Sequence, residues 1–118
     1  MANMDHVRRT MAGSFVAVAL FSFGTVPVVA QESIAAEISI KNRQFEPSEI
    51  QVAAGKQIAL TVKNLDVTPA EFESVALRVE KVIAGHSQAI IRLRPTQPGR
   101  YNFVDDFHQS TKGVLIVQ

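Results

Sequence analysis

Short apolar runs with an alternating pattern constrain the fold of this chain most strongly. In AEISIKN the isoleucines Ile38 and Ile40 lie two residues apart, and QIALTVKN and SQAIIRLRP repeat the same period. Side chains two residues apart in a strand point to one face, so each run predicts a strand with one buried face. Gly, Pro and Asn-Asp turns separate the runs, and no long stretch after residue 30 has an uninterrupted helical stripe. We therefore predict an all-β, Greek-key β-sandwich of seven or eight short strands.

The first thirty residues predict a cleavable signal peptide. A positive region around Arg8 precedes an uncharged stretch over residues 11–29, and small residues up to Ala30 suit a peptidase that cuts before Gln31. A membrane anchor is the alternative, but the Gly and Pro near the end of the stretch favour cleavage. We expect an exported, periplasmic protein whose single domain spans residues 31–118.

The absence of cysteine limits the chemistry of such a domain. An exported domain without cysteine has no disulfide and depends on its core alone for stability. No thiolate is available to a metal, which excludes a blue-copper centre and ordinary iron–sulfur ligation. The expected mature segment has no net formal charge, so nothing indicates nucleic acid as a partner. Hydrolase motifs and a Gly-rich phosphate loop are also missing from the sequence.

Glu71 and Glu73 form a first acidic pair, in the segment PAEFESVA. In a strand both carboxylates project to one face, and their proximity costs Coulomb repulsion unless something positive lies between them. A bound metal ion would remove this repulsion. An exposed edge strand on which Arg78, Lys81 or Arg100 pairs with the glutamates also explains the pattern. The residues alone leave both interpretations open.

The segment FVDDFHQSTKG holds the second cluster. Asp105, Asp106 and His108 follow a predicted strand, and the spacing lets the side chains of Asp105 and His108 converge on one centre. Two aspartates also open a turn well, and a histidine in a loop is usually only solvated, so this cluster has two interpretations as well. His86, in a Gly-His-Ser turn, is interpreted as a surface residue.

The order of these motifs resembles the cupredoxin superfamily. The segments FEPSEIQVAAG, VKNLD, PGRYNF and GVLIV follow one another as they do there, and the likeness covers residues 36–118. The chain departs from the blue-copper pattern at Asp105, which stands where those proteins have cysteine. More narrowly, EFES, EKVIAG, PGRYNF and DDFH are similar to the cysteine-free cupredoxin-like components of bacterial Ftr-type and EfeUOB-like iron transport systems.

The narrower resemblance implies a metal site and a role. It implies Glu71, Glu73, Asp105 and His108 as ligands of copper or iron, with Asp106 as an alternative ligand or a residue that supports the others. It also implies a periplasmic protein that assists high-affinity iron uptake beside an iron permease of the inner membrane, through ferroxidase-like oxidation of ferrous iron. The alternative is a non-redox protein: a copper-binding or buffering module, or a metal-free domain that docks onto a partner.

Overall fold

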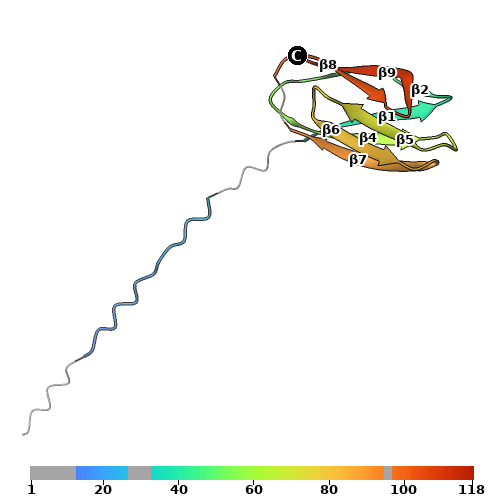
Figure 1. Ribbon diagram of the computed structural model, residues 1–118. Helices are drawn as coiled ribbons and strands as arrows, with labels where there is room; N and C mark the ends of the chain where they lie inside the picture. Colours follow the sequence, from blue (N-terminus) through green and yellow to red (C-terminus); the bar gives the residue numbers. More distant parts are fainter. Residues whose placement is uncertain (1–12, 27–32, 95–96) are drawn as a thin grey trace, which may run out of the picture.

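The computed structural model describes residues 13–26, 33–94 and 97–118 (Figure 1). Within them the chain forms nine strands and no helix, which confirms the predicted all-β sandwich. Residues 13–26 form neither strand nor helix, and their side chains are exposed. The rest of the predicted signal peptide, including its cleavage site, lies outside the described residues, so the signal peptide stays a prediction. The described part of the chain has no helix that is both long and apolar enough to cross a membrane.

Two sheets pack face to face in the described domain. One has four strands in the order β2-β1-β4-β7, and the other has five in the order β3-β9-β8-β5-β6. The pairs β1–β4 and β3–β9 are parallel, and the other pairs are antiparallel. The chain passes from one sheet to the other between β2 and β3, β3 and β4, β4 and β5, β6 and β7, and β7 and β8. The strands are β1 (Ser33–Lys41), β2 (Gln44–Glu46), β3 (Glu49–Val52), β4 (Gln57–Asn64), β5 (Ala70–Ser74), β6 (Val79–Ile83), β7 (Ser87–Leu93), β8 (Gly99–Asp105) and β9 (His108–Val117).

The core lies between the two sheets and follows the predicted alternation. Ile38 and Ile40 of β1 are buried, as are the apolar positions of β4 and β7 that share their period. At the centre three phenylalanine rings meet: the ring centroid of Phe103 lies 4.9 Å from that of Phe45 and 5.0 Å from that of Phe72. Aromatic pairs at these separations contribute beyond their buried area. The rings join strands β2, β5 and β8 across the sandwich.

The strand prediction is wrong in three details. It placed His108 in a loop before the last strand, whereas β9 already begins at His108. It missed β2, because this strand has three residues and a single buried position, Phe45, which is too short to show alternation. The pattern of LRVEKVIAG also predicts a strand that starts at Leu77, whereas β6 begins at Val79. Arg78 has a positive φ of 55°, a conformation that belongs to a turn and not to a strand.

A buried amide organises the loops at the end of β4. Asn64 is 1% exposed, and its Nδ2 donates to the carbonyl oxygens of Thr68, Ile83 and Ala84 at 2.8, 3.2 and 3.3 Å. The loop that leads into β5 is thereby bound to the end of β6. Buried polar groups need such partners, so this side chain fixes the segment that delivers the first acidic pair.

Candidate metal centre

Strand β5 presents its two glutamates on the face opposite the core. Ala70, Phe72 and Ser74 are buried and point inward, so Glu71 and Glu73 point to the other face of the five-stranded sheet. This confirms that the two carboxylates are neighbours on one face. Glu71 is nevertheless only 8% exposed, which is unusual for a carboxylate outside the core.

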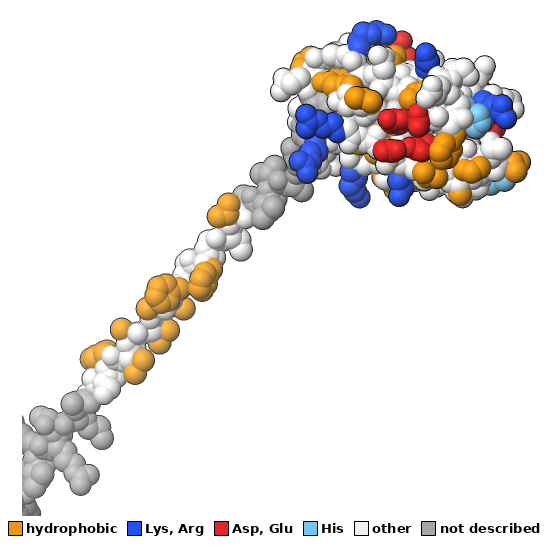
Figure 2. All heavy atoms as spheres, in the orientation of Figure 1, with side chains coloured by type: hydrophobic (Ala, Val, Ile, Leu, Met, Phe, Trp, Pro, Cys, Tyr) orange, Lys and Arg blue, Asp and Glu red, His pale blue; other side chains and the backbone are white. Residues whose placement is uncertain are grey.

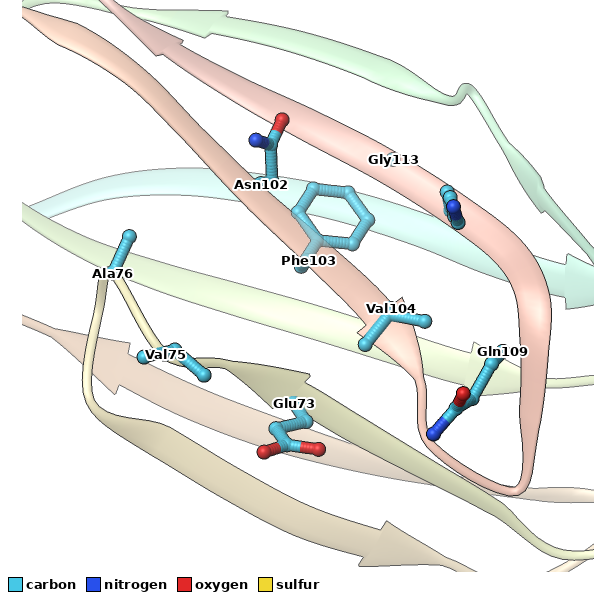
Figure 3. A pocket seen from close by; sticks show the side chains of 9 residues that line it. Glu73, Val75, Ala76, Asn102, Phe103, Val104, Gln109 and Gly113 are labelled. Atoms are coloured by element: carbon cyan, nitrogen blue, oxygen red, sulfur yellow. The ribbon is translucent and has the colours of Figure 1, made fainter.

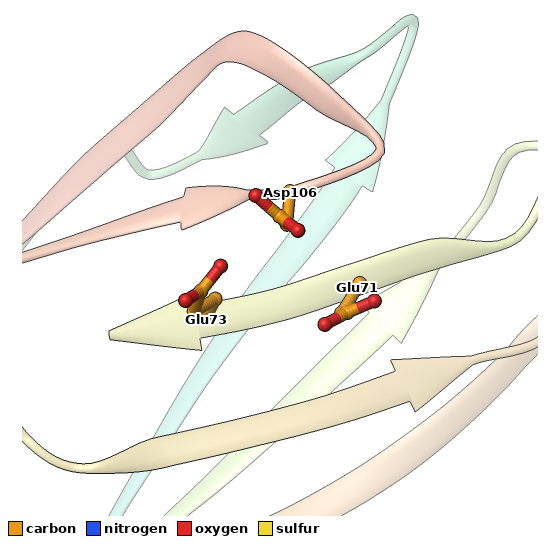
Figure 4. A group of neighbouring side chains, drawn as sticks. All are labelled: Glu71, Glu73 and Asp106. Carbon is orange, nitrogen blue, oxygen red and sulfur yellow. The ribbon is translucent and has the colours of Figure 1, made fainter. Parts of the chain in front are cut away.

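The turn between β8 and β9 brings a third carboxylate to this pair. The backbone N–H of Asp106 donates to the carbonyl oxygen of Glu71 at 2.8 Å, which holds the turn against β5. One carboxylate oxygen from each of Glu71, Glu73 and Asp106 lies within 4.8 Å of the others (Figure 4). Two segments distant in the sequence therefore meet, as the motifs predicted. The two segments that meet are strand β5, with Glu71 and Glu73, and the residue directly after β8, which is Asp106.

Asp105 lies next to this cluster but points elsewhere. It is 1% exposed, and its Oδ1 accepts the backbone N–H of Glu71 at 2.9 Å and that of Phe107 at 3.1 Å. Its Oδ2 lies 2.9 Å from Nδ1 of His108, whose side chain is 22% exposed. Asp105 and His108 thus converge on each other, and Asp106 is the aspartate that joins the two glutamates. His86 is exposed, as predicted.

A fourth carboxylate, which the sequence analysis missed, comes from β6. Glu80 stands directly opposite Glu73 in the β5–β6 register and forms a side-chain hydrogen bond with Glu71. The sequence held a signal for it. A β-hairpin that turns near Leu77 places residues about equally far from the turn opposite each other, and Glu73 and Glu80 satisfy this relation.

The crowding of acids raises two pKa values. The pKa of Glu71 rises from 4.5 to about 7, first because of its hydrogen bond with Glu80, then because of burial and the negative charges of Glu80, Asp106 and Glu73. The pKa of Glu73 is also raised, chiefly by the negative charge of Asp106, with burial and a hydrogen bond to Asp106 adding to it. Every one of these influences disfavours the ionised carboxylates.

Basic side chains do not relieve this repulsion in the described domain. The structure joins neither Glu71 nor Glu73 in an ion pair with Arg78, Lys81 or Arg100, the pairings that would have explained the glutamates without a ligand. In Figure 2 acidic side chains lie side by side over β5 and β6, next to hydrophobic ones. The cluster therefore presents negative charge that the described residues do not neutralise.

Solvent reaches the cluster from the side of Glu73. A groove of about 790 Å³ lies between the end of β5 and strands β8 and β9, and Glu73 lines it together with Val75, Asn102 and Val104 (Figure 3). Glu71 is the buried member of the cluster, whereas Glu73 and Asp106 are partly exposed. The groove gives an ion from solution access to the carboxylate of Glu73.

Known proteins share parts of this sequence and its arrangement of strands. The uncharacterized protein RP394 of Rickettsia prowazekii (strain Madrid E) is 40% identical over 82 residues, which are 69% of this chain and 66% of that protein. This chain thus spans about two thirds of the length of that relative.

Several solved structures have a similar fold. The metal-binding domain of the Streptococcus pneumoniae D39 Cu(I)-exporting P-type ATPase CopA, with Cu(I), matches with a TM-score of 0.62 and 19% identity over 75% of this chain and 98% of that chain. The purple cupredoxin from Nitrosopumilus maritimus matches with a TM-score of 0.57 and 17% identity, over 70% and 99% of the two chains. Amicyanin from Paracoccus versutus matches with a TM-score of 0.56 and 15% identity, over 71% and 81%. At these identities the likeness shows the fold.

The sequence also matches a family directly. The cupredoxin-like domain family covers residues 13–117, which is most of the chain. The nine-stranded sandwich agrees with that match. The chain belongs to the cupredoxin-like domain family.

Proposed function

We propose that this domain binds a metal cation through the carboxylates of Glu71, Glu73 and Asp106, with Glu80 at the edge of the site. The observation that carries the proposal is the meeting of three carboxylates within 4.8 Å, one of them on a residue that is only 8% exposed, without a basic partner among the described residues. Enclosing such a group costs free energy unless a cation balances it. A metal ion supplies that balance.

The donor set determines which metals fit. Cu(I) is the ion in the CopA metal-binding domain described above, but this chain has no cysteine to offer it. Carboxylate oxygens are hard donors, so the site suits Fe(III), Fe(II), Cu(II), Zn(II) or Mn(II) and offers little to Cu(I). The residues present therefore fit a copper or iron ion in its harder states and do not fit a copper–thiolate centre.

Iron is the proposed substrate, and its oxidation is the proposed activity. Several carboxylates neutralise a ferric ion better than a ferrous one, so binding lowers the Fe(III)/Fe(II) potential by about 59 mV for each tenfold preference. A thousandfold preference amounts to roughly 180 mV. Each ferrous ion loses one electron, and dioxygen in solution is the oxidant that takes four electrons and four protons to leave as two water molecules. We place this step in the periplasm, ahead of an iron permease of the inner membrane.

A non-redox role is the second candidate. The similarity in fold to the metal-binding domain of a Cu(I)-exporting ATPase favours it, because that domain holds copper within a transport protein. In this role the domain would hold or deliver a metal ion without changing its oxidation state.

Metal titration of the whole chain tests the site, and ferrous iron in air separates the two roles. We expect Cu(II) and Mn(II) to bind the wild-type protein and raise its melting temperature, by the equivalent of about 2.7 kcal/mol at a hundredfold excess over Kd. The double variant Glu71→Gln/Glu73→Gln should lose this response. Glu46→Gln/Glu49→Gln, which removes the same charge from exposed positions on β2 and β3, should keep it.

Two results would refute these roles. Unchanged melting of the wild-type chain with both ions excludes the metal site. Ferrous iron that oxidises in air no faster with the wild-type chain than with the Glu71→Gln/Glu73→Gln variant excludes the oxidative role and leaves the non-redox one.

A further inference from the structure

Both carboxylate oxygens of Asp105 have partners within the protein. Oδ1 accepts the backbone N–H of Glu71 at 2.9 Å and that of Phe107 at 3.1 Å, and Oδ2 lies 2.9 Å from Nδ1 of His108. The side chain is also almost completely buried. A carboxylate that accepts several hydrogen bonds in a buried position is well placed to fix backbone geometry.

The hydrogen bonds of Asp105 form where the connection between β5 and β8 is short. In the described residues the register joins these strands through two residue pairs, one of which is Phe72 with Asp105. An irregularity in the β8–β9 register also falls immediately before Asp105. A side-chain oxygen that accepts the N–H of Glu71 extends this connection beyond the regular ladder. The carbonyl oxygen of Glu71 meanwhile accepts the N–H of Asp106, so both backbone polar groups of Glu71 are bound to residues of this segment.

We propose that Asp105 is a positioning residue, whose hydrogen bonds hold Glu71 and Asp106 at the separation that a cation requires. This inference rests on the metal site proposed above. The N–H of Asp106 donates to the carbonyl oxygen of Glu71, and the N–H of the next residue, Phe107, donates to Oδ1 of Asp105. Hydrogen bonds therefore hold the backbone on both sides of the Asp106 side chain. Because a single oxygen, Oδ1, holds both Glu71 and Phe107, strand β5 and the turn cannot separate without breaking these bonds. The cluster thus keeps its spacing even though its members repel one another.

The same carboxylate orients His108. An ionised carboxylate oxygen only accepts hydrogen bonds, so Nδ1 of His108 donates to Oδ2 of Asp105. Asp105 thus contacts His108 in addition to the backbone that carries the carboxylates of the cluster.

An isosteric substitution separates positioning from ligation. Asparagine keeps an oxygen that accepts the N–H groups of Glu71 and Phe107, but it removes the charge that makes aspartate a good metal ligand. In Mn(II) titrations of the full chain, followed by the electron paramagnetic resonance signal of the free ion, we expect Asp105→Asn to bind within about threefold of wild type. Asp105→Ala should bind about 10- to 100-fold more weakly. Asp106→Asn is the matched control, because it removes the same charge from the cluster itself, and it should lose more than about tenfold.

The variants also show how the inference fails. If Asp105→Asn loses as much affinity as Asp106→Asn, Asp105 is a ligand and the proposal is overturned. This comparison decides the question even if Asp105→Ala does not fold. If the wild-type chain binds no Mn(II), both the metal site and this inference are refuted. If the wild-type chain binds Mn(II) normally and only Asp105→Asn binds more weakly, the metal site stands and the positioning role is refuted.

Discussion

Glu73 on β5 lies directly opposite Glu80 on β6. Like charges at opposed positions of an antiparallel pair destabilise it, so this arrangement costs stability in the metal-free protein. Glu71 and Asp106 increase the cost, since both add negative charge within reach of the pair. In such a cluster, protons and metal ions compete for the same oxygens, and several measurable consequences result.

The stability of the metal-free protein should fall as pH rises from about 4.5 to about 7. The pKa of Glu71 is raised from 4.5 to about 7, so the native state holds this proton more tightly than the unfolded state does. The proton on Glu71 therefore stabilises the native state fully at pH values below the pKa of the unfolded state. This stabilisation is lost as the pH rises through the pKa of the folded state, which is about 7. Urea denaturation from pH 4 to pH 8 with a chelator measures it. We expect Glu71→Gln to make the decline shallower.

The control for this experiment is Glu46→Gln, an exposed carboxylate on β2. It should keep the wild-type decline with pH. A decline that is equally steep in Glu71→Gln would show that other groups cause the pH dependence.

Replacement of Glu80 by Gln should lower the pKa of Glu71. The hydrogen bond from Glu80 is the largest cause of the raised value, and its charge contributes further. A glutamine removes the charge and can donate an N–H to the ionised carboxylate, which favours the ionised form. Side-chain carboxyl carbon shifts, followed by NMR during a pH titration, report this pKa directly. A Glu71 titration that does not move in Glu80→Gln would mean that Glu80 does not contact it.

Alternation in the sequence was enough to predict most of the fold. Residues such as Ile38, Ile40 and Phe103 are buried as their period requires, because a sheet buried on one face imposes that period on its strands. The same rule placed Glu71 and Glu73 together on one face.

The details of the site could not be predicted from that period. Asp105 and Asp106 are adjacent, and only the geometry of the turn decides which carboxylate points inward and which joins the glutamates. Glu80 depends on the register of the β5–β6 hairpin, which in turn depends on the positive φ of Arg78. Period-two patterns contain no information about turn conformation or about which strands are neighbours.

Asn64→Ala should destabilise the domain by about 1–3 kcal/mol, because three carbonyl oxygens lose a buried donor. The loop into β5 should also become less protected against hydrogen exchange, since Asn64 binds it to the end of β6. Chemical denaturation and amide exchange measure the two effects. Leu65→Ala, at the half-exposed neighbouring position, is the control and should change stability much less. Equal losses in the two variants would contradict a special role for the amide.

Gly113→Ala should destabilise the protein by about 1–3 kcal/mol through overpacking. Gly113 lies opposite Phe103 in the β8–β9 register, and a β-carbon there would overlap Cε2 and Cζ of the Phe103 ring and lie 3.0 Å from the carbonyl oxygen of Ser48. The ring has little room to move, because it packs against Phe45 and Phe72 on its other sides. Thermal unfolding measures the effect, with Ser110→Ala on the exposed part of β9 as the control. If Gly113→Ala is as stable as Ser110→Ala, the three phenylalanine rings can shift to accept a side chain at position 113. The packing of the rings would then not require a glycine there.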